Sequence, residues 1–535
     1  MQTNVQSIMS DTLNNLKEKS NILWVDDEIE SLKSNIMFLK QKGYNVQEAT
    51  NGEDGINLIR TNEFDLVFLD EMMTGMGGLQ TLLEIKDIKP SLPVVMVTKN
   101  ETESLMEDAI GNKISDYLIK PVNPTQLLLV CKKMLDSKRL KGSQVSKDYI
   151  QEFNKISMAM MESPTWQEWI DIHMKMTGWE LELDEHPDLG LKQTILTQKR
   201  DCNTEFSKFV EKNYLDWVNS DTDKPILSNE IVDKFVIPEL NSDKSVFLFV
   251  VDCMRMDQWM VMEKYLYDYF KISKDYHYSI LPTATPYSRN AIFSGLFPSD
   301  IEKHYPELWK KNDDDENSKN NYEKDFLTKL LERRRVKLRN ELKYTKIMDS
   351  NFGRGIESKI MSYTQNHLNA IVINFVDMIA HSRSDNAILK EIAPDESAYR
   401  SLTASWFEHS SFFGMLRQLS TKKDVKIILT TDHGSIRCLH GVKAMGDRET
   451  STNLRYKCGR NVKSDSRHAI FVRNPLDYKL PKRNGVVNYI IAKEDFYFVY
   501  PTDYHKYLNQ YNDTFQHGGI SIDEMILPVV TLDPK

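Results

Sequence analysis

The chain has 535 residues, of which 40% are hydrophobic, 27% charged and 10% aromatic, and its formal net charge is −9 at pH 7. This length predicts several domains, each with enough apolar residues for a core of its own. The acidic balance argues against a general duplex DNA-binding protein, which needs clustered cations to displace the counterions of the phosphate backbone.

Apolar, strand-like runs alternate with amphipathic stretches at the front of the chain. The stretches SLKSNIMFLKQKG and EDGINLIRT have the residue spacing of helices. Strands that alternate with helices at this pitch predict a doubly wound parallel sheet. The runs ILWVDDE, FDLVFLD, PVVMVT and DYLIKP end in or just before polar residues, namely Asp26 and Asp27, Asp70, Thr98, and Lys120.

These motifs resemble the response-regulator receiver domain over its whole length, so a (βα)5 receiver is expected over residues 1–136. The resemblance implies that Asp70 accepts a phosphoryl group from a sensor histidine kinase. Three clustered carboxylates repel one another, and a hard divalent cation together with the Lys120 ammonium would make such a site stable. The ligands implied for one Mg²⁺ are Asp26, Asp27, the Asp70 carboxylate and the Met72 carbonyl.

The resemblance also assigns the switch residues of the receiver, which would be Thr98 and Tyr117, with Lys120 beside them. Phosphorylation adds about 1.5–2 negative charges, and its usual consequence in receivers is dimerisation through the face around Tyr117. We therefore expect a homodimer on phosphorylation. One departure from the family is Lys99, which follows Thr98 where a small residue is usual.

Residues 137–238 are predicted to form a helical bundle. The stretches SKDYIQEFNKISMAMM, TWQEWIDIHMKMTGWELEL and NTEFSKFVEKNYLDWV carry Trp, Met, Lys and Glu at helical spacing. Aromatic residues at this spacing favour a packed core over a cofactor site. From its place in the chain, the bundle is expected to transmit dimerisation of the receiver to the domain that follows.

Metal-ligand residues follow three apolar runs in the C-terminal part of the chain. The runs VFLFVVD, AIVINFVD and KIILTTDHG lead to Asp252, Asp377, and the pair Asp432 and His433. Buried parallel strands have this composition, and ligands bind beyond the carboxyl ends of such strands. Asp377 and His381 are four residues apart, so one helical turn would place both on one face. Carboxylate and imidazole together suit Zn²⁺ or Mn²⁺.

Each of these residues also has an ordinary structural interpretation. An Asp after a strand is often a helix N-cap, and Thr285 before Pro286 is at home in a turn. It is their joint occurrence in this order that favours a site.

Five stretches resemble the alkaline phosphatase superfamily of two-metal phosphohydrolases, and within it the PglZ-type domain: VVDCMRMDQW, LPTATPYSRNAIFSGLFP, NFVDMIAH, LTTDHGS and QHGGIS. The resemblance implies an α/β/α domain over residues 239–535. Thr285 would be its nucleophile, in preference to Thr283. Two Zn²⁺ are implied, one held by Asp377, His381 and His517 and the other by Asp252, Asp432 and His433.

Some superfamily motifs are missing from the sequence, and their absence limits the class of ester that is expected as substrate. Its monoesterases have a third metal site and an arginine that grips the phosphate, and neither has a clear counterpart here; Arg289 is the nearest basic candidate. Sulfatases need a C/S-x-P-x-R segment, and Cys253 does not lie in one. The balance favours phosphodiesters over monoesters or sulfate esters.

Two polar stretches of this domain are ambiguous. The segment 310–324, KKNDDDENSKNNYEK, has no apolar period, which predicts a mobile loop or a lid over the site. The basic residues Arg455, Lys457, Arg460 and Lys463 are candidates for contact with an anionic substrate, or are simply surface.

The remaining features concern the compartment. The five cysteines, Cys131, Cys202, Cys253, Cys438 and Cys458, lack paired metal-ligand spacing. The N-terminus lacks the apolar run of a signal peptide, and no stretch reaches the 18 or so apolar residues of a membrane helix. A soluble protein of the bacterial cytoplasm, without a membrane span, is expected.

Taken together, the receiver, helical middle and PglZ-type domain resemble the PorX-type response regulators associated with type IX secretion. The resemblance implies a phosphorylation-controlled, zinc-dependent phosphodiesterase that acts on nucleotide or oligonucleotide substrates and does not bind duplex DNA directly. The alternative is a signalling adaptor with a structural metal site, which acts by binding a sigma factor or another partner.

Overall fold

The computed structural model describes residues 20–99, 114–310, 320–385, 387–447, 451–482 and 487–535. The chain divides into two compact units, Met1–Tyr149 and Ile150–Lys535, and each is described by itself. Among the described residues, no helix is long and apolar enough to cross a membrane.

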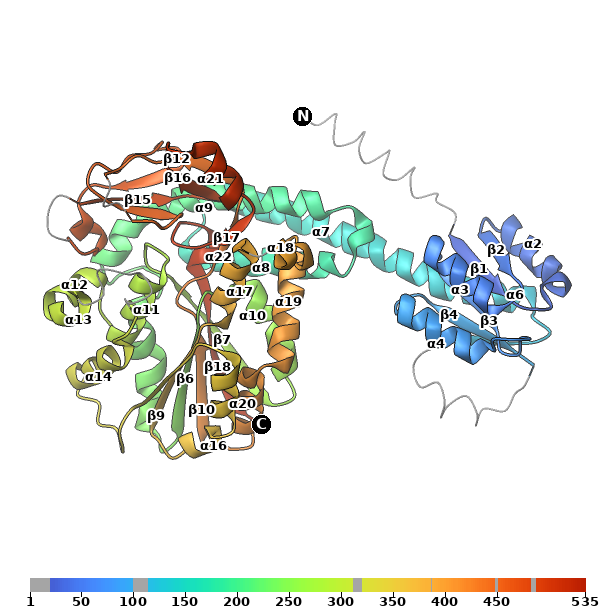
Figure 1. Ribbon diagram of the computed structural model, residues 1–535, viewed down its shortest axis with the longest axis horizontal. Helices are drawn as coiled ribbons and strands as arrows, with labels where there is room; N and C mark the ends of the chain where they lie inside the picture. The colour runs from blue at the N-terminus through green and yellow to red at the C-terminus, as the bar shows by residue number, and fades with distance from the viewer. Residues whose placement is uncertain (1–19, 100–113, 311–319, 386, 448–450, 483–486) are drawn as a thin grey trace. The chain divides into compact units, whose positions relative to one another are not determined.

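The first unit is built on a five-stranded parallel sheet with the order β2-β1-β3-β4-β5 (Figure 1). Its strands are β1 Asn21–Val25, β2 Asn45–Ala49, β3 Leu66–Asp70, β4 Val94–Thr98 and β5 Asp116–Ile119, and its helices are η1 Ile29–Leu32, α2 Lys33–Gln41, α3 Gly52–Thr61, α4 Gly78–Ile88 and α6 Pro124–Cys131. Alternate residues of β1 enter different cores, Ile22 and Trp24 on one face and Leu23 and Val25 on the other, because successive side chains of a strand point to opposite faces.

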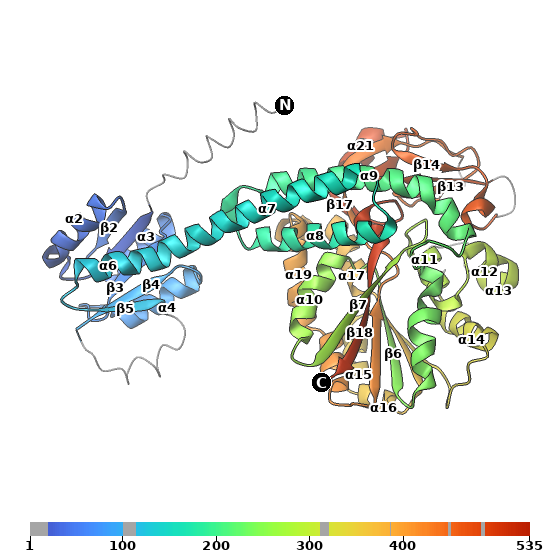
Figure 2. The same cartoon turned by 180° about the vertical axis from the view of Figure 1, so that it is seen from behind.

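The helical middle consists of α7 Ser137–Met161, α8 Trp166–Asp184 and α9 Lys192–Asn219. The sequence starts α8 sharply, since Thr165 and Glu168 form a capping box that satisfies free backbone N–H groups. In the second unit α8 and α9 lie side by side (Figure 2). Their aromatic side chains pack together and against the long strand β7: the Phe206 ring lies 5.3 Å from the Trp169 ring and 6.1 Å from the Tyr278 ring.

A six-stranded sheet with the order β7-β18-β10-β6-β9-β8 forms the centre of the second unit. Strands β10, β6, β9 and β8 are parallel, whereas β18 runs antiparallel to both β10 and β7. The strand bounds are β6 Ser245–Val251, β7 Phe270–Tyr278, β8 Lys343–Ile347, β9 Leu368–Ile373, β10 Val425–Thr430 and β18 Ile526–Pro534.

Helices cover both faces of this sheet (Figure 1). One core joins it to α10 Met256–Glu263, α15 Ser350–Glu357, α16 Ile360–Tyr363, α19 Glu396–His409 and α20 Ser411–Leu419. The other joins it to α11 Thr285–Ser294, α12 Pro298–His304, α13 Pro306–Lys310 and α14 Glu323–Arg333. The predicted fold class, an α/β multi-domain chain with a doubly wound receiver, a helical middle and an alkaline-phosphatase-like α/β/α domain, is confirmed.

Smaller elements lie beyond the carboxyl ends of the parallel strands. They include α17 Phe375–Asp385, α18 Ala387–Ile392, α21 Tyr504–Tyr511 and α22 Ile522–Met525. Three small sheets pair β11 Ile436–Cys438 with β17 Thr514–Gln516, β12 His440–Lys443 with β16 Phe496–Val499, and β15 Asn488–Ala492 with β13 Tyr456–Gly459 and β14 Ala469–Val472.

Candidate active site

The expected catalytic residues gather at the carboxyl edge of the large sheet. Asp252 directly follows β6, Asp432 and His433 follow β10, and Thr285 opens α11. Parallel strands end at the same edge, so residues far apart in the chain meet there.

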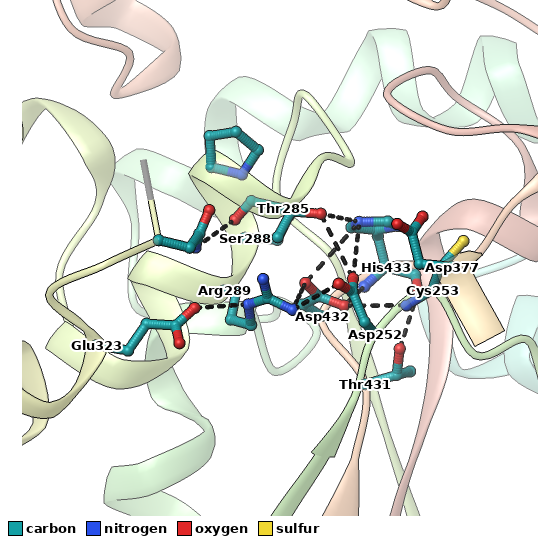
Figure 3. Close-up of polar contacts among 12 residues, drawn as sticks. Asp252, Cys253, Thr285, Ser288, Arg289, Glu323, Asp377, Thr431, Asp432 and His433 are labelled. Carbon is teal, nitrogen blue, oxygen red and sulfur yellow. Dashed lines mark hydrogen bonds and ion pairs between the residues drawn. The ribbon is translucent and has the colours of Figure 1, made fainter. Parts of the chain in front are cut away.

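Asp252, Asp432 and His433 form a compact, buried cluster (Figure 3). One ligand atom from each lies within 4.8 Å of the others, and the three residues are at most 2% exposed. The His433 Nε2 atom is 3.7 Å from Asp252 Oδ1 and 3.8 Å from Asp432 Oδ2. Nitrogen and carboxylate oxygens that converge on one point are a donor set that suits Zn²⁺.

Backbone groups orient this cluster. The Asp432 Oδ1 atom accepts hydrogen bonds from the N–H groups of Cys253, at 3.3 Å, and His433, at 3.1 Å. His433 Nδ1 lies 3.0 Å from the Gly434 carbonyl oxygen, to which it donates. That bond assigns the ring proton to Nδ1, so the Nε2 lone pair points into the cluster, as a metal ligand requires.

The charges of the cluster also fit a divalent cation. Burial, together with the neighbouring Asp252 carboxylate, raises the pKa of Asp432 well above its usual range. Burial disfavours the charged form of a base too, and it therefore lowers the pKa of His433. A divalent cation held by these side chains would offset the repulsion between the two carboxylates.

Thr285 is placed against this cluster. Its Oγ1 atom is 2.9 Å from His433 Nε2 and 3.4 Å from Asp252 Oδ1. Thr283 is used differently: its hydroxyl donates to the Gly519 carbonyl oxygen at 2.7 Å and accepts from the Gly518 N–H at 3.2 Å, with no exposed surface. The hydroxyl of Thr285, and not that of Thr283, therefore faces the cluster.

The ligands expected for the other ion lie beside the first set. His517 Nε2 is 3.7 Å from Asp377 Oδ1, and the His517 ring stacks on the His433 ring with centroids 4.2 Å apart. His381 belongs to α17, four residues after Asp377, and its side chain lies outside the described residues. The structure thus brings together the side chains of five of the six expected ligands.

Arg289 lies between the buried cluster and Glu323. Its Nη1 lies 2.7 Å from Asp252 Oδ2, and its Nε donates to Glu323 Oε1 at 2.7 Å. The side chain is 2% exposed. Arg289 therefore orients Asp252, and its contacts do not make this nearest basic candidate a counterpart of the arginine that grips the phosphate.

Two residues of the site were missed in the sequence, Asn320 and Glu323. Both belong to the polar segment expected to be a mobile loop, whose residues 311–319 lie outside the described residues. These two are 4% and 0% exposed, which contradicts a solvated loop at their positions and leaves the alternative of a lid untested. Asn320 Nδ2 donates to the Thr285 carbonyl oxygen at 3.3 Å. The only sequence signal for Glu323 is that it begins the amphipathic helix α14.

Of the late basic residues, the two that are buried serve the fold. Arg455 has no exposed surface, and its guanidinium holds Glu524 in a two-pronged ion pair. Lys457 is 1% exposed and donates to the Thr452 carbonyl oxygen. Neither reaches solvent to meet an anionic substrate.

In the first unit, the side chains of Asp26, Asp27 and Asp70 offer oxygens within 4.8 Å of one another. Lys120 Nζ lies 2.9 Å from Asp26 Oδ2 and 3.0 Å from Asp70 Oδ1. Burial raises the pKa of Asp70, against the opposing effect of Lys120. Asp27 is held by Thr74, whose hydroxyl and N–H donate to its Oδ2 and lower its pKa. The arrangement suits a small hard cation such as Mg²⁺.

The expected switch residues of this unit differ in exposure. Thr98 is buried at the end of β4, whereas Tyr117 is 53% exposed and points away from the core. Met72, whose carbonyl is the expected Mg²⁺ contact, has an exposed side chain. Lys99 is paired with Glu28 at 3.0 Å across the surface.

Comparison with known families matches nearly the whole chain. Residues 22–132 match the response regulator receiver domain, residues 139–218 the PorX response regulator linker domain, and residues 231–532 the BREX system PglZ alkaline phosphatase-like domain.

Individual relatives cover less of the chain. The transcriptional regulatory protein ZraR of Klebsiella oxytoca is 34% identical over 139 residues, which are 26% of this chain and 31% of that protein. The transcriptional regulatory protein ResD of Bacillus subtilis is 31% identical over 117 residues, 22% of this chain and 48% of that protein. The chain thus spans less than half the length of these curated relatives.

Solved structures of receivers are also similar. A CheY-like receiver domain protein of Methanospirillum hungatei is 29% identical, with 23% of this chain and 99% of that one covered and a TM-score of 0.22. The response regulator TrrA of Thermotoga maritima, solved with Mg²⁺ and beryllofluoride, is 29% identical over 22% of this chain and 99% of that one, with a TM-score of 0.21.

The match to the PglZ domain covers more than half of the chain, and a receiver implies a cognate sensor kinase. The chain therefore belongs to the PglZ alkaline phosphatase-like family, and its receiver, PorX linker and PglZ domains, in this order, make it a PorX-type response regulator.

Proposed function

We propose that this response regulator is a zinc-dependent phosphodiesterase whose activity is controlled by phosphorylation of Asp70. Its substrates would be nucleotide or oligonucleotide phosphodiesters, and phosphorylation would act by dimerisation. The match to the PorX linker supports a link to type IX secretion, with a sensor histidine kinase upstream and a sigma factor as a further protein partner.

The observation that carries the proposal is the position of the Thr285 hydroxyl. It lies within hydrogen-bond reach of His433 Nε2 and 3.4 Å from Asp252 Oδ1, both members of the buried cluster. An adaptor with a purely structural metal site needs no hydroxyl there. Thr285 would attack phosphorus and displace one ester group as its alcohol, and water would then cleave the bond between Thr285 and phosphorus, which releases the phosphomonoester and restores the hydroxyl.

Two Zn²⁺ ions would be held by Asp252, Asp432 and His433 and by Asp377, His381 and His517. Bound there, zinc would acidify the Thr285 hydroxyl and offset negative charge on the phosphoryl oxygens. The chain's own groups prepare this chemistry. Hydrogen bonds from Cys253 and His433 N–H groups hold the Asp432 carboxylate.

Asp252 is oriented by a second chain of contacts. Arg289 holds its Oδ2 atom, and Glu323 in turn fixes the Arg289 guanidinium. A carboxylate that is already held in place loses little freedom when it binds a cation, so the site is preorganised.

A diester is favoured over a monoester by the charge of the site. A monoester dianion gains most from a guanidinium that grips it through two N–H groups, and the contacts of Arg289 are with Asp252 and Glu323 instead. A diester carries one negative charge and depends less on such a group.

The test compares two chromogenic substrates with zinc-loaded full-length protein. We expect bis-p-nitrophenyl phosphate to be hydrolysed faster than p-nitrophenyl phosphate, and chelator-treated protein to be inactive. Faster release from the monoester would contradict the diesterase. Absence of turnover with zinc bound would favour the adaptor.

A further inference from the structure

Lys346 is a lysine beside the candidate active site that the mechanism above does not use. It lies in β8, at the carboxyl edge of the sheet, with Val372 of β9 as its parallel neighbour. Its Nζ atom donates to the Asn320 carbonyl oxygen at 3.1 Å and lies 3.8 Å from Glu323 Oε2. Asn320 also contacts the Thr285 backbone and Glu323 contacts Arg289, so Lys346 belongs to the same group of side chains.

Lys346 differs from the other charged residues of this group in its access to solvent. Its side chain is 22% exposed, compared with 2% for Arg289 and 0% for Glu323. Of these two cations, Arg289 is held at both ends of its guanidinium by carboxylates. Lys346 contacts the buried residues Asn320 and Glu323 and also reaches the solvent.

The ammonium of Lys346 also retains hydrogen-bonding capacity. An ammonium has three N–H donors, and within the described residues Asn320 O is the acceptor that lies within hydrogen-bond distance of Nζ. Glu323 at 3.8 Å is beyond that distance and is already bound by Arg289 and by the Tyr344 hydroxyl. The described part of the chain therefore leaves donors of Lys346 for a ligand.

The location of Lys346 relative to the nucleophile follows from Asn320. Lys346 Nζ donates to the Asn320 carbonyl, and Asn320 Nδ2 donates to the Thr285 carbonyl at 3.3 Å. Two hydrogen bonds thus connect Lys346 to the backbone of Thr285. Burial lowers the pKa of Lys346. The carboxylates of Glu323, Asp252 and Asp432 act to raise it.

We propose that Lys346 is a phosphate-binding residue, which donates a hydrogen bond to a non-bridging phosphoryl oxygen of the anion that occupies this site. The inference rests on the proposed function, since it takes the phosphoryl group of that substrate as the ligand. A charge-assisted N–H···O⁻ bond in a partly desolvated site is about twice as strong as a neutral one. Lys346 would thus supply a single hydrogen bond to the phosphoryl group, and not the two-pronged grip of a guanidinium.

A purely structural role would consist of supporting Asn320 and Glu323. Measuring phosphate binding in a protein without turnover distinguishes this structural role from direct phosphate binding. We would titrate inorganic phosphate into zinc-loaded full-length Thr285→Ala protein by calorimetry, with and without Lys346→Met. The matched control is Lys343→Met, which changes an exposed lysine on the same strand.

Lys346→Met should weaken phosphate binding by about tenfold or more, because a hydrogen bond to a charged group is lost. Lys346→Arg should retain most of the affinity, and Lys343→Met all of it, with zinc content unchanged in each protein. Lys346→Gln, which keeps a donor for Asn320, provides the same test if the methionine variant does not fold.

Phosphate affinity in Lys346→Met or Lys346→Gln equal to that of Lys343→Met would overturn the proposal, as would absence of phosphate binding to the zinc-loaded Thr285→Ala protein. Phosphate binding that depends on Lys346, in a protein that fails to hydrolyse diesters, would leave this inference standing and remove the proposed function instead.

Discussion

Arg289 and Glu323 determine how Asp252 is presented at the candidate metal site. The Glu323 carboxylate neutralises an Arg289 guanidinium that is in contact with an expected metal ligand. Without it, the full positive charge of Arg289 would act on Asp252 and compete with a bound cation.

Glu323→Gln should therefore weaken zinc binding. Changes to the groups that orient metal ligands typically cost about 10–100-fold in metal affinity, and we expect a loss in that range. Competition with a fluorescent zinc chelator measures it. Glu341→Gln is the control, because Glu341 is an 85% exposed residue paired with Lys324. Equal zinc affinity in the two variants would show that Glu323 has no influence on the site.

His173, in α8, predicts a dependence of stability on pH. Burial, with Lys199 nearby, lowers its pKa from 6.5 to about 3. Below pH 6.5 the unfolded chain binds a proton that the folded chain does not, so stability falls as pH decreases towards 3. One such group contributes a slope of at most about 1.4 kcal/mol per pH unit.

His173→Phe should make the free energy of unfolding less sensitive to pH between 7 and 5, by roughly 2 kcal/mol over that interval. Urea denaturation at several pH values measures the slope. The exposed His409 provides the control, and His409→Phe should keep the slope of the wild type. An unchanged slope in His173→Phe would mean that His173 is not held neutral by burial.

At the scale of single residues, the sequence predicted what lies next to a recognisable motif. Asp252, Asp432 and His433 could be predicted to converge, because each follows an apolar parallel strand. Glu323 could not, because its contact with Arg289 spans 34 positions and depends on how α14 packs against α11. The contacts of Lys346 with Asn320 and Glu323 could not be predicted either, because the sequence of β8 does not show which residues lie beside that strand.

At the scale of elements, the linker helices are joined to the PglZ domain by buried ion pairs. Lys199 of α9 lies 3.1 Å from Glu180 of α8, 3.0 Å from Glu396 of α19 and 3.2 Å from Asp523 of α22. Burial acts to raise the pKa of Glu396, but the surrounding cations, led by Lys199, outweigh it and lower that pKa to about 2. Lys199 is thus the cation shared by carboxylates from three elements.

Lys199→Met should destabilise the protein by about 3–5 kcal/mol, because it leaves buried carboxylates without their partner. Urea denaturation followed by tryptophan fluorescence measures the loss. Lys208→Met is the control on the same helix, since its pair with Glu205 is exposed and should contribute about 1 kcal/mol or less. A loss in Lys199→Met no larger than in the control would contradict this account of the interface.

The helices themselves were predictable, because their apolar spacing is strongly periodic and α8 carries a capping box. The strand against which these helices pack could not be predicted. Periodicity identifies a buried face, but it does not say that Phe206 of α9 packs against Tyr278 of β7. The charged residues Lys199 and Glu180 also break the pattern of a purely apolar core.

At the scale of the whole molecule, the proposed control of activity begins at Asp70. Beryllofluoride mimics an acyl phosphate, and we expect it to shift the zinc-loaded protein from monomer towards dimer. Asp70→Asn should abolish the shift, because the acceptor carboxylate is lost. Asp65→Asn, at the other end of the β3 segment, should preserve it. Light scattering after gel filtration measures the mass. A shift of Asp70→Asn to the dimer on addition of beryllofluoride would exclude Asp70 as the residue that controls dimerisation.

The order of domains was the most predictable feature of the chain, since each domain carries its own motifs. The boundaries of compact units were less so. Helix α7 spans the division between Tyr149 and Ile150, so a single helix contributes residues to both units. The apolar spacing of a helix does not show where along that helix one compact unit ends and the next begins.

The central claim is that the Thr285 hydroxyl attacks phosphorus. The measurement that tests it most directly is hydrolysis of bis-p-nitrophenyl phosphate by zinc-loaded wild-type, Thr285→Ser and Thr285→Val proteins, each checked for zinc content. Valine has the shape of threonine without the hydroxyl, so we expect it to abolish turnover, while serine retains a measurable part. Turnover in Thr285→Val equal to that in the wild type would contradict the account.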